Sequence, residues 1–244
     1  DVCSSDLLIT GSQIVGLTAT QLKGMTSATF GALSTTAINS LTSAQTPQLN
    51  TTVVSKITSD QVNSLTSSSL RALTSSQVIQ LSTDAVSALS ATLINQLTAA
   101  DVKEFSTTQI ANLTTTQMNS LNSSTIGALS SSQFNALATE VINKISSAKI
   151  PGMIATQFAG MTGSSFEALG TTNINSLNQT QVKALNTSIF NSLSTDSVNA
   201  LTTSALNALG SAQIRSINAS AISALSTDTI AALSNTVISS LSTA

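Results

Sequence analysis

Histidine, tryptophan and tyrosine are absent from this chain of 244 residues, and its single cysteine is Cys3. The common general bases, nucleophiles and zinc ligands are therefore missing from almost the whole chain, and an enzyme, a bound cofactor or a metal centre is not expected. Charged residues make up 7 %, against about 25 % in ordinary soluble domains. The net charge of −2 offers no basic stripe for nucleic acid.

Long apolar runs are also lacking, although apolar residues make up 41 % of the chain. No run approaches the roughly 18 residues that a membrane helix requires, so membrane insertion is not expected. The polar residues are almost entirely Ser, Thr, Asn and Gln. This composition can supply a core but offers few charged groups for chemistry.

What the chain does contain is an eight-residue repeat that runs from Ile9 to Ser240 without insertion or deletion. Of its 29 octads, 21 have Leu at place 1, and 28 have an apolar residue at place 6. Typical octads are FSTTQIAN and LTTTQMNS (105–120). So strict a short period predicts a repeat array, stabilised by stacking each unit on its neighbours.

The polar places of the octad favour a short helix over a rung of a β-solenoid, which is the alternative. Place 2 is Ser, Thr or Asn in 25 octads, the residue types preferred at a helix N-cap. Gly170 and Gly210 occupy it in two more. Place 5 is Gln in 11 octads, which completes a capping box. We therefore predict an all-α solenoid of very short capped helices, one per octad.

Charged residues give an independent test of this interpretation. Six acids lie at places 4 or 5, in the expected first turn: Asp60, Asp84, Asp101, Glu140, Asp196 and Asp228. Seven bases lie at places 7 or 8, near the expected helix end: Lys23, Lys56, Arg71, Lys103, Lys144, Lys183 and Arg215. The helix dipole favours this distribution, whereas a β-solenoid gives no reason for it.

Small residues and departures from the pattern add three expectations. Place 8 is Ala, Ser or Gly in 22 octads, which would let neighbouring segments approach closely. Pro47 and Pro151 lie at place 7 and predict local breaks, with 145–154 a second irregular point after 41–48. Aliphatic residues occupy place 5 at 48-residue intervals, which suggests a larger structural repeat of six octads: Leu93, Val141, Ile189 and Val237, with Val53 a further 40 residues earlier.

No candidate site emerges that outweighs a structural interpretation. Four acids share place 4 and could be imagined as calcium ligands: Asp60, Asp84, Asp196 and Asp228. They are isolated, whereas calcium needs six or more oxygens. Five Phe residues at place 6 are expected in the core: Phe30, Phe134, Phe158, Phe166 and Phe190. Asn-x-Ser/Thr sequons follow from composition: Asn50, Asn112, Asn122, Asn178, Asn186 and Asn218.

The ends of the chain depart from the repeat. The first seven residues, DVCSSDL, match the in-frame translation of a widely used sequencing adapter. We therefore expect 1–8 to be an artefactual, non-repeat leader of a metagenomic fragment, with Cys3 incidental. Residues 9–244 are predicted to form a single continuous solenoid, with a partial octad at 241–244.

The combination of leucine, cap and Gln resembles the octapeptide Thr-x-x-Gln repeat regions of large bacterial surface or secreted proteins. This resemblance implies a non-enzymatic scaffold, stalk, spacer or filament segment, at the cell surface or outside the cell. The alternative is an adhesive module whose Ser/Thr-rich surface binds glycan, protein or ice. Unpaired apolar faces at the ends predict self-association, end to end or lateral.

Overall fold

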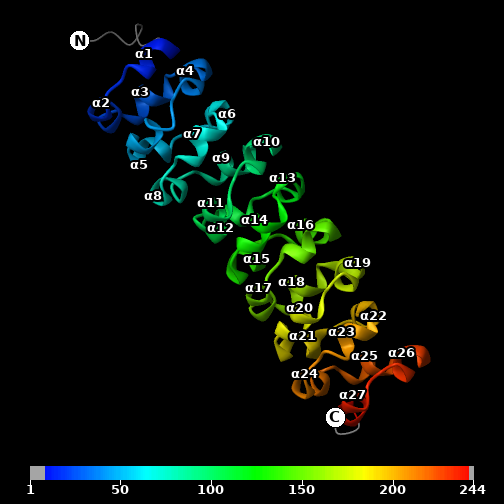
Figure 1. The fold of residues 1–244 in the computed structure, drawn as a ribbon. Helices are drawn as coiled ribbons and strands as arrows, with labels where there is room; N and C mark the ends of the chain where they lie inside the picture. Colours follow the sequence, from blue (N-terminus) through cyan, green and yellow to red (C-terminus); the bar gives the residue numbers. More distant parts are fainter. Residues whose placement is uncertain (1–8, 242–244) are drawn as a thin grey trace. The chain divides into compact units, whose positions relative to one another are not determined.

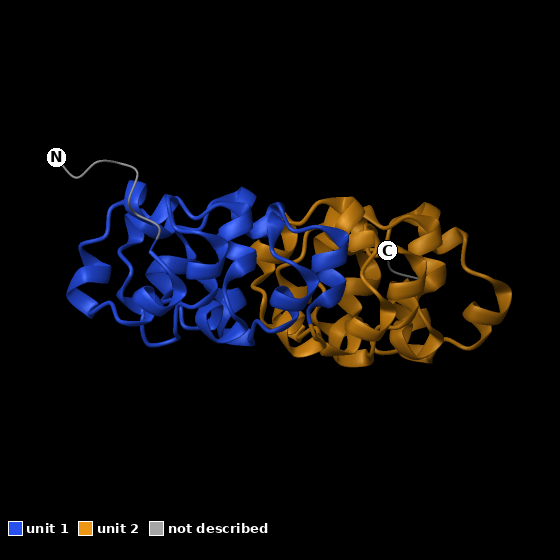
Figure 2. Cartoon of the chain, turned by 90° about the horizontal axis from the view of Figure 1, so that it is seen from above, with its two compact units in different colours: residues 1–121 blue, residues 122–244 orange. Residues whose placement is uncertain are grey.

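The computed structural model describes residues 9–241, and within this range it contains helices and no strand. Each of the 29 octads contributes one helical element of three to seven residues. The predicted all-α solenoid of short helices is therefore confirmed, and the β-solenoid alternative is wrong. The chain forms two compact units, 1–121 and 122–244, which are coloured separately in Figure 2.

The elements of the first unit, in chain order, are these: α1 Gly11–Val15, α2 Ala19–Lys23, α3 Ser27–Gly31, α4 Thr35–Asn39, η1 Thr46–Gln48, α5 Thr51–Val54, α6 Ser59–Ser64, α7 Ser67–Arg71, α8 Ser75–Val78, α9 Thr83–Ala88, α10 Ala91–Asn95, α11 Ala99–Lys103, α12 Thr107–Ala111 and α13 Thr115–Ser120. Those of the second unit are these: α14 Ser123–Ala128, α15 Ser131–Ala136, α16 Thr139–Asn143, η2 Ser147–Gly152, α17 Ala155–Ala159, α18 Gly163–Glu167, α19 Gly170–Asn175, α20 Gln179–Ala184, α21 Thr187–Ser192, α22 Thr195–Ala200, α23 Thr203–Leu206, α24 Ser211–Arg215, α25 Ala219–Ser223, α26 Thr227–Ala231 and α27 Asn235–Leu241.

The place-2 residue is the N-cap of nearly every helix, as predicted. In α13 the Thr114 hydroxyl accepts from the backbone N–H of Gln117 at 3.2 Å, and the Gln117 carboxamide oxygen accepts from the Thr114 N–H at 2.9 Å. Both partners of the capping box are thus engaged. Helices this short are unstable alone in water, so the cap defines where each begins while packing against other octads provides the stability.

Two place-2 residues depart from the capping pattern. Gly170 is not a cap: it is the first residue of α19, with a positive φ of 75°, and Leu169 precedes it in helical conformation. Only glycine adopts this backbone region without strain, which explains the residue at this position. Ile154 precedes α17 in the cap position, but its side chain cannot accept a hydrogen bond and remains 52 % exposed.

The two proline octads are the two that lack an α-helix, as the sequence predicted. Pro47 lies in the 3-10 helix η1 and Pro151 in the 3-10 helix η2. Proline removes a backbone donor and blocks continuation of an α-helix, so each octad forms a tighter turn instead. Thr46, the exception at place 6, is fully buried because its hydroxyl donates to the Thr42 carbonyl at 3.0 Å.

The helices stack with a period of three octads. In the first unit α1 packs on α4, α4 on α6 and α6 on α9, and in the second unit α19 packs on α22 and α22 on α25 (Figure 1). In every case the partners are three octads apart along the chain. Each group of three octads is one coil of the solenoid, and each coil lies against the next within its unit.

This geometry explains the 48-residue spacing of aliphatic residues at place 5. In the second unit, α16, α18, α21, α24 and α27 form one continuous column of helices, each packed on the next. Val141, Ile189 and Val237 lie in the first, third and fifth helices of that column. Six octads are therefore two coils, and the aliphatic residues recur on one side at alternate levels.

The core consists of the place-1 and place-6 rows. Place-1 residues from Met25 to Leu233 are at most 8 % exposed, and place-6 residues from Ile14 to Ile214 are at most 7 % exposed. The five place-6 Phe residues named above are among the largest fully buried side chains, as expected. Burying such side chains contributes about 1.5–3 kcal/mol each.

Small residues at places 8 and 3 meet where coils touch. A Cβ added at Gly160 would lie 2.5 Å from the Cβ of Ser131, and one at Gly152 would lie 2.6 Å from the carbonyl oxygen of Ser123. The expected close approach of small place-8 residues is therefore confirmed at these positions. Larger side chains would push the coils apart.

Substitution Gly152→Ala is expected to destabilise the second unit by about 1–3 kcal/mol, because the contacted atoms of Ser123 include rigid backbone. Urea denaturation followed by circular dichroism measures this change. The matched control is Gly31→Ala, where an added Cβ meets nothing within 4 Å and alanine raises helix propensity. Equal effects of the two substitutions would contradict the close-packing explanation.

Candidate functional site

The most specialised side chain of the octad is the place-5 glutamine, which makes two kinds of contact at once. The Gln117 carboxamide oxygen completes the capping box of its own helix. Its Nε2 donates to the carbonyls of Val86 at 2.9 Å, Ser87 at 3.0 Å and Leu89 at 2.9 Å. These carbonyls belong to the preceding coil, so Gln117 joins two coils through a single buried side chain.

The same bridge recurs at the same sequence offsets in both units. The Nε2 donates to the place-1 carbonyl 28 residues earlier and to the place-6 carbonyl 31 residues earlier, as in the pairs of Gln77 with Leu49 and Thr46. Bridging glutamines of the two units are Gln45, Gln61, Gln77, Gln109, Gln117, Gln157, Gln181 and Gln213. All of these are at most 8 % exposed. A neutral amide that satisfies both its oxygen and its nitrogen is well suited to burial.

Where place 5 is aliphatic or Ala, an asparagine at the cap place reaches the same carbonyls. Asn186 Nδ2 donates to Met161 O at 3.0 Å and to Ala159 O at 3.1 Å, and place 5 of its octad is Ile189. Asn50 does the same beside Val53, and Asn218 reaches Leu193 O. The inter-coil amide is thus retained while its origin changes from place 5 to place 2.

Asparagine or glutamate at place 7 makes a third connection, toward the following coil. Asn63 Nδ2 donates to Ala88 O at 2.6 Å, and its Oδ1 accepts from the cap N–H of Ser90 at 2.8 Å. Place 5 of that octad is Leu93, so its own capping-box acceptor is missing. Glu167 serves the cap N–H of Ser194 in the same way at 2.9 Å. Every buried side-chain polar atom of the described residues has a partner.

The charged residues lie where the helix dipole predicts. All six acids at places 4 and 5 lie in first turns, and five of the seven bases lie in last turns: Lys23, Arg71, Lys103, Lys183 and Arg215. Lys144 is the C-cap of α16, and Lys56 follows the C-cap of α5. Asp101 replaces Gln in a capping box, accepting from the Thr98 N–H at 2.6 Å.

The imagined calcium ligands are not brought together. Asp60, Asp84, Asp196 and Asp228 are exposed residues on four separate helices. Within residues 9–241 no group of three or more His, Cys, Asp or Glu could hold a metal ion. In the same range no helix has the length and apolar character needed to cross a membrane. Cys3 lies outside the described residues.

The sequon asparagines have structural roles. Asn50, Asn122, Asn178, Asn186 and Asn218 are N-caps, and Asn112 is the C-cap of α12. At Asn50, Asn186 and Asn218 the Nδ2 that a glycan would occupy already bridges to another coil. Glycosylation at these three positions would remove that bridge.

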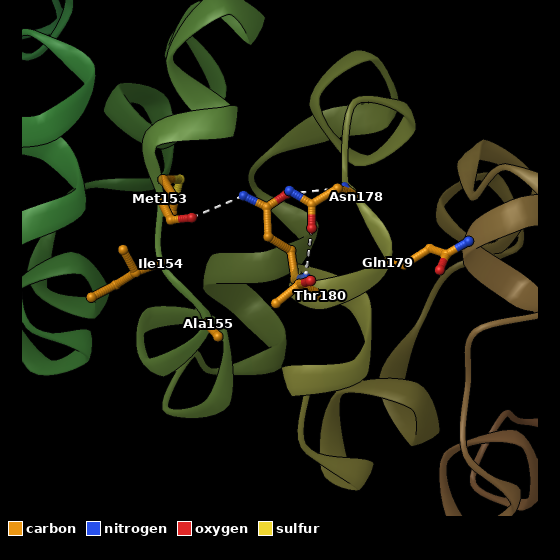
Figure 3. Close-up of a pocket in the computed structure, with 7 residues that line it drawn as sticks. Met153, Ile154, Ala155, Asn178, Gln179 and Thr180 are labelled. Atoms are coloured by element: carbon orange, nitrogen blue, oxygen red, sulfur yellow. Dashed lines mark hydrogen bonds between the residues drawn. The ribbon is translucent and has the colours of Figure 1, made fainter.

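Surface hollows are shallow grooves between stacked helices. The largest of those identified, of about 590 Å³, lies between α17 and α20. Figure 3 shows Met153, Ile154 and Ala155 on one side and Asn178, Gln179 and Thr180 on the other. The bridge from Gln181 Nε2 to Met153 O, 2.9 Å long, crosses between the two sides. The groove contains no charged or nucleophilic group, and its polar atoms serve the stacking of coils.

The fold and these bridges define a class of protein, the α-solenoid built from octapeptide repeats. Two stretches of the chain, 94–131 and 198–235, match the family model described as ALTTAQ repeat. Both matches begin at place 6 of an octad, with Ile94 and Val198. The chain therefore contains repeats similar to that family. The search of curated proteins gives no match.

Proposed function

We propose that this chain is a non-enzymatic structural segment, a scaffold, stalk or spacer whose function is the stacked array itself. The observation that carries the proposal is the inter-coil amide bridge, which repeats at fixed offsets of 28 and 31 residues in both units. The polar groups most specific to this sequence are directed inward and join coils. The match to a repeat family supports a repeat region as the unit of function.

An extracellular or cell-surface location belongs to the same proposal. It is supported by the resemblance to repeat regions of large bacterial surface and secreted proteins and by the low content of charged residues.

A second candidate is an adhesive surface, favoured by exposed hydroxyls at place 4 of successive helices. Thr108 in α12 and Thr116 in α13 are exposed examples. The place-2 hydroxyls support this candidate less, because most of them accept the capping N–H of their own helix.

Binding and activity assays on the purified chain test the structural proposal. A glycan array and an ice-recrystallisation assay are expected to give no saturable signal, and a panel of hydrolase and transferase substrates no turnover. A variant with Thr108→Val and Thr116→Val serves as the control for any signal at that surface. Saturable binding lost in this variant would establish the adhesive candidate instead, and turnover that tracks the purified chain would overturn the non-enzymatic proposal.

A further inference from the structure

The two faces of each coil are chemically different. Place-6 side chains are buried in every described octad except the last three, where Ile222 is half-buried, Ile230 is 42 % exposed and Ile238 is 39 % exposed. A place-6 residue is therefore covered by the coil that follows it. These three isoleucines, on the outer side of the last coil, are called the last-coil face.

The opposite face carries place 1 and the place-5 amide. Ile9 and Leu17 are half-buried, whereas the place-1 residues from Met25 to Leu233 are buried. Gln13 and Gln21 are exposed, whereas the later place-5 glutamines are buried. Ile9, Leu17, Gln13 and Gln21 are called the first-coil face.

The glutamines of the first-coil face are half-used. Each carboxamide oxygen accepts the cap N–H of its own helix, at 2.8 Å for Gln13 and 2.9 Å for Gln21. Their Nε2 atoms donate to no carbonyl among residues 9–241, whereas the Nε2 of Gln45 in the next coil donates to Ile14 O at 2.7 Å. Two amide donors are thus presented outward beside apolar side chains.

We propose that the first-coil face of one copy of this chain binds the last-coil face of a second copy, giving head-to-tail assembly through the same bridge that joins coils within the chain. The proposal rests on continuity with that internal interface and on donor–acceptor complementarity. It deepens the structural function proposed above.

The register follows from the internal offsets. If the second copy continues the octad phase, Gln13 takes the place of a glutamine that lies 28 residues after Leu225 and 31 residues after Ile222. Gln21 then meets the carbonyls of Leu233 and Ile230 in the same way. The isoleucines of the last-coil face are covered by Ile9 and Leu17, as place 6 is covered by place 1 between internal coils. Contacts between two different faces generate open chains of subunits.

Two face variants separate head-to-tail assembly from other arrangements. Gln13→Glu with Gln21→Glu keeps the capping-box acceptor, as Asp101 demonstrates in α11, but removes the amide donors and adds charge. Ile230→Asp with Ile238→Asp adds charge to exposed positions of the last-coil face. Ile79→Asp is the control, since Ile79 is 50 % exposed at the C-cap of α8 and belongs to neither face.

Sedimentation velocity at increasing protein concentration gives the readout, with circular dichroism to verify folding. The wild type and Ile79→Asp are expected to form a series of oligomers. Each face variant alone is expected to associate at least about 100-fold more weakly. An equimolar mixture of the two face variants is expected to form a heterodimer, because each retains one intact face.

Other outcomes overturn the proposal in distinguishable ways. Loss of assembly in Ile79→Asp alone would indicate lateral packing, and assembly of either face variant alone would indicate contact between like faces. A wild type that remains monomeric would refute head-to-tail assembly while leaving the structural role of the single array intact. Saturable ligand binding would affect the proposed function but not this result.

Discussion

Replacing Phe190 with Ala is expected to lower the free energy of unfolding of the second unit by about 3–5 kcal/mol. Phe190 is a place-6 residue of α21 with 0 % of its side chain exposed. Its helix packs between α18 and α24, so neighbouring coils on both sides are held at a fixed spacing and cannot collapse into the cavity. Urea denaturation at low protein concentration, followed by circular dichroism, measures the loss.

Ile230→Ala is the control for the Phe190 substitution. Ile230 also occupies place 6, but it is 42 % exposed and no following coil covers it. Its truncation is expected to cost less than about 1 kcal/mol, since little apolar surface is lost from the interior. Similar losses at both positions would mean that place-6 burial does not depend on the stacking of coils.

Gln117→Met is expected to lower the free energy of unfolding of the first unit by about 2–4 kcal/mol. Methionine matches glutamine in length but leaves the Thr114 N–H and the carbonyls of Val86 and Leu89 without their amide partner. Burying polar groups without a partner costs about 1–3 kcal/mol each. Hydrogen exchange of the Thr114 amide, compared with urea denaturation, measures the local and global effects.

Gln21→Met separates the bridge from the capping box. Gln21 makes the capping box with Thr18 but is exposed on the first coil. Water can replace its lost hydrogen bond, so we expect a loss of about 0.5–1 kcal/mol. Equal losses for Gln117→Met and Gln21→Met would show that glutamine acts through capping alone.

Local features of the fold could be predicted from the sequence because they depend on neighbours within one octad. The cap at Thr114, its partner Gln117 and the charges in first and last turns involve residues only a few positions apart. The breaks at Pro47 and Pro151 follow from proline chemistry alone. At Gly170 the local rule failed because glycine suits both a cap and a positive φ, and the residue type cannot distinguish them.

Features that depend on the coil could not be derived in this way. Three octads per coil is set by the angle at each bend, which the octad pattern does not encode. The second partner of Gln117 lies 28 to 31 residues away, so its bridge was missed although its capping role was predicted. The 48-residue spacing of Val141, Ile189 and Val237 was the one sequence signal of the coil, and it acquires meaning only once α16, α21 and α27 share a column. The prediction of a single continuous array over 9–244 stays a prediction.

The central claim is that one buried amide, from place 5 or place 2, joins each coil to the preceding place-1 carbonyl. A double-mutant cycle on Asn186→Ser and Ile189→Gln tests it, because Ser keeps the cap while an amide at place 5 offers the alternative route to Met161 O. Measured by urea denaturation, the account predicts that Ile189→Gln offsets the loss caused by Asn186→Ser, with a favourable coupling energy of about 1 kcal/mol or more. Effects that add within about 0.5 kcal/mol would contradict the claim.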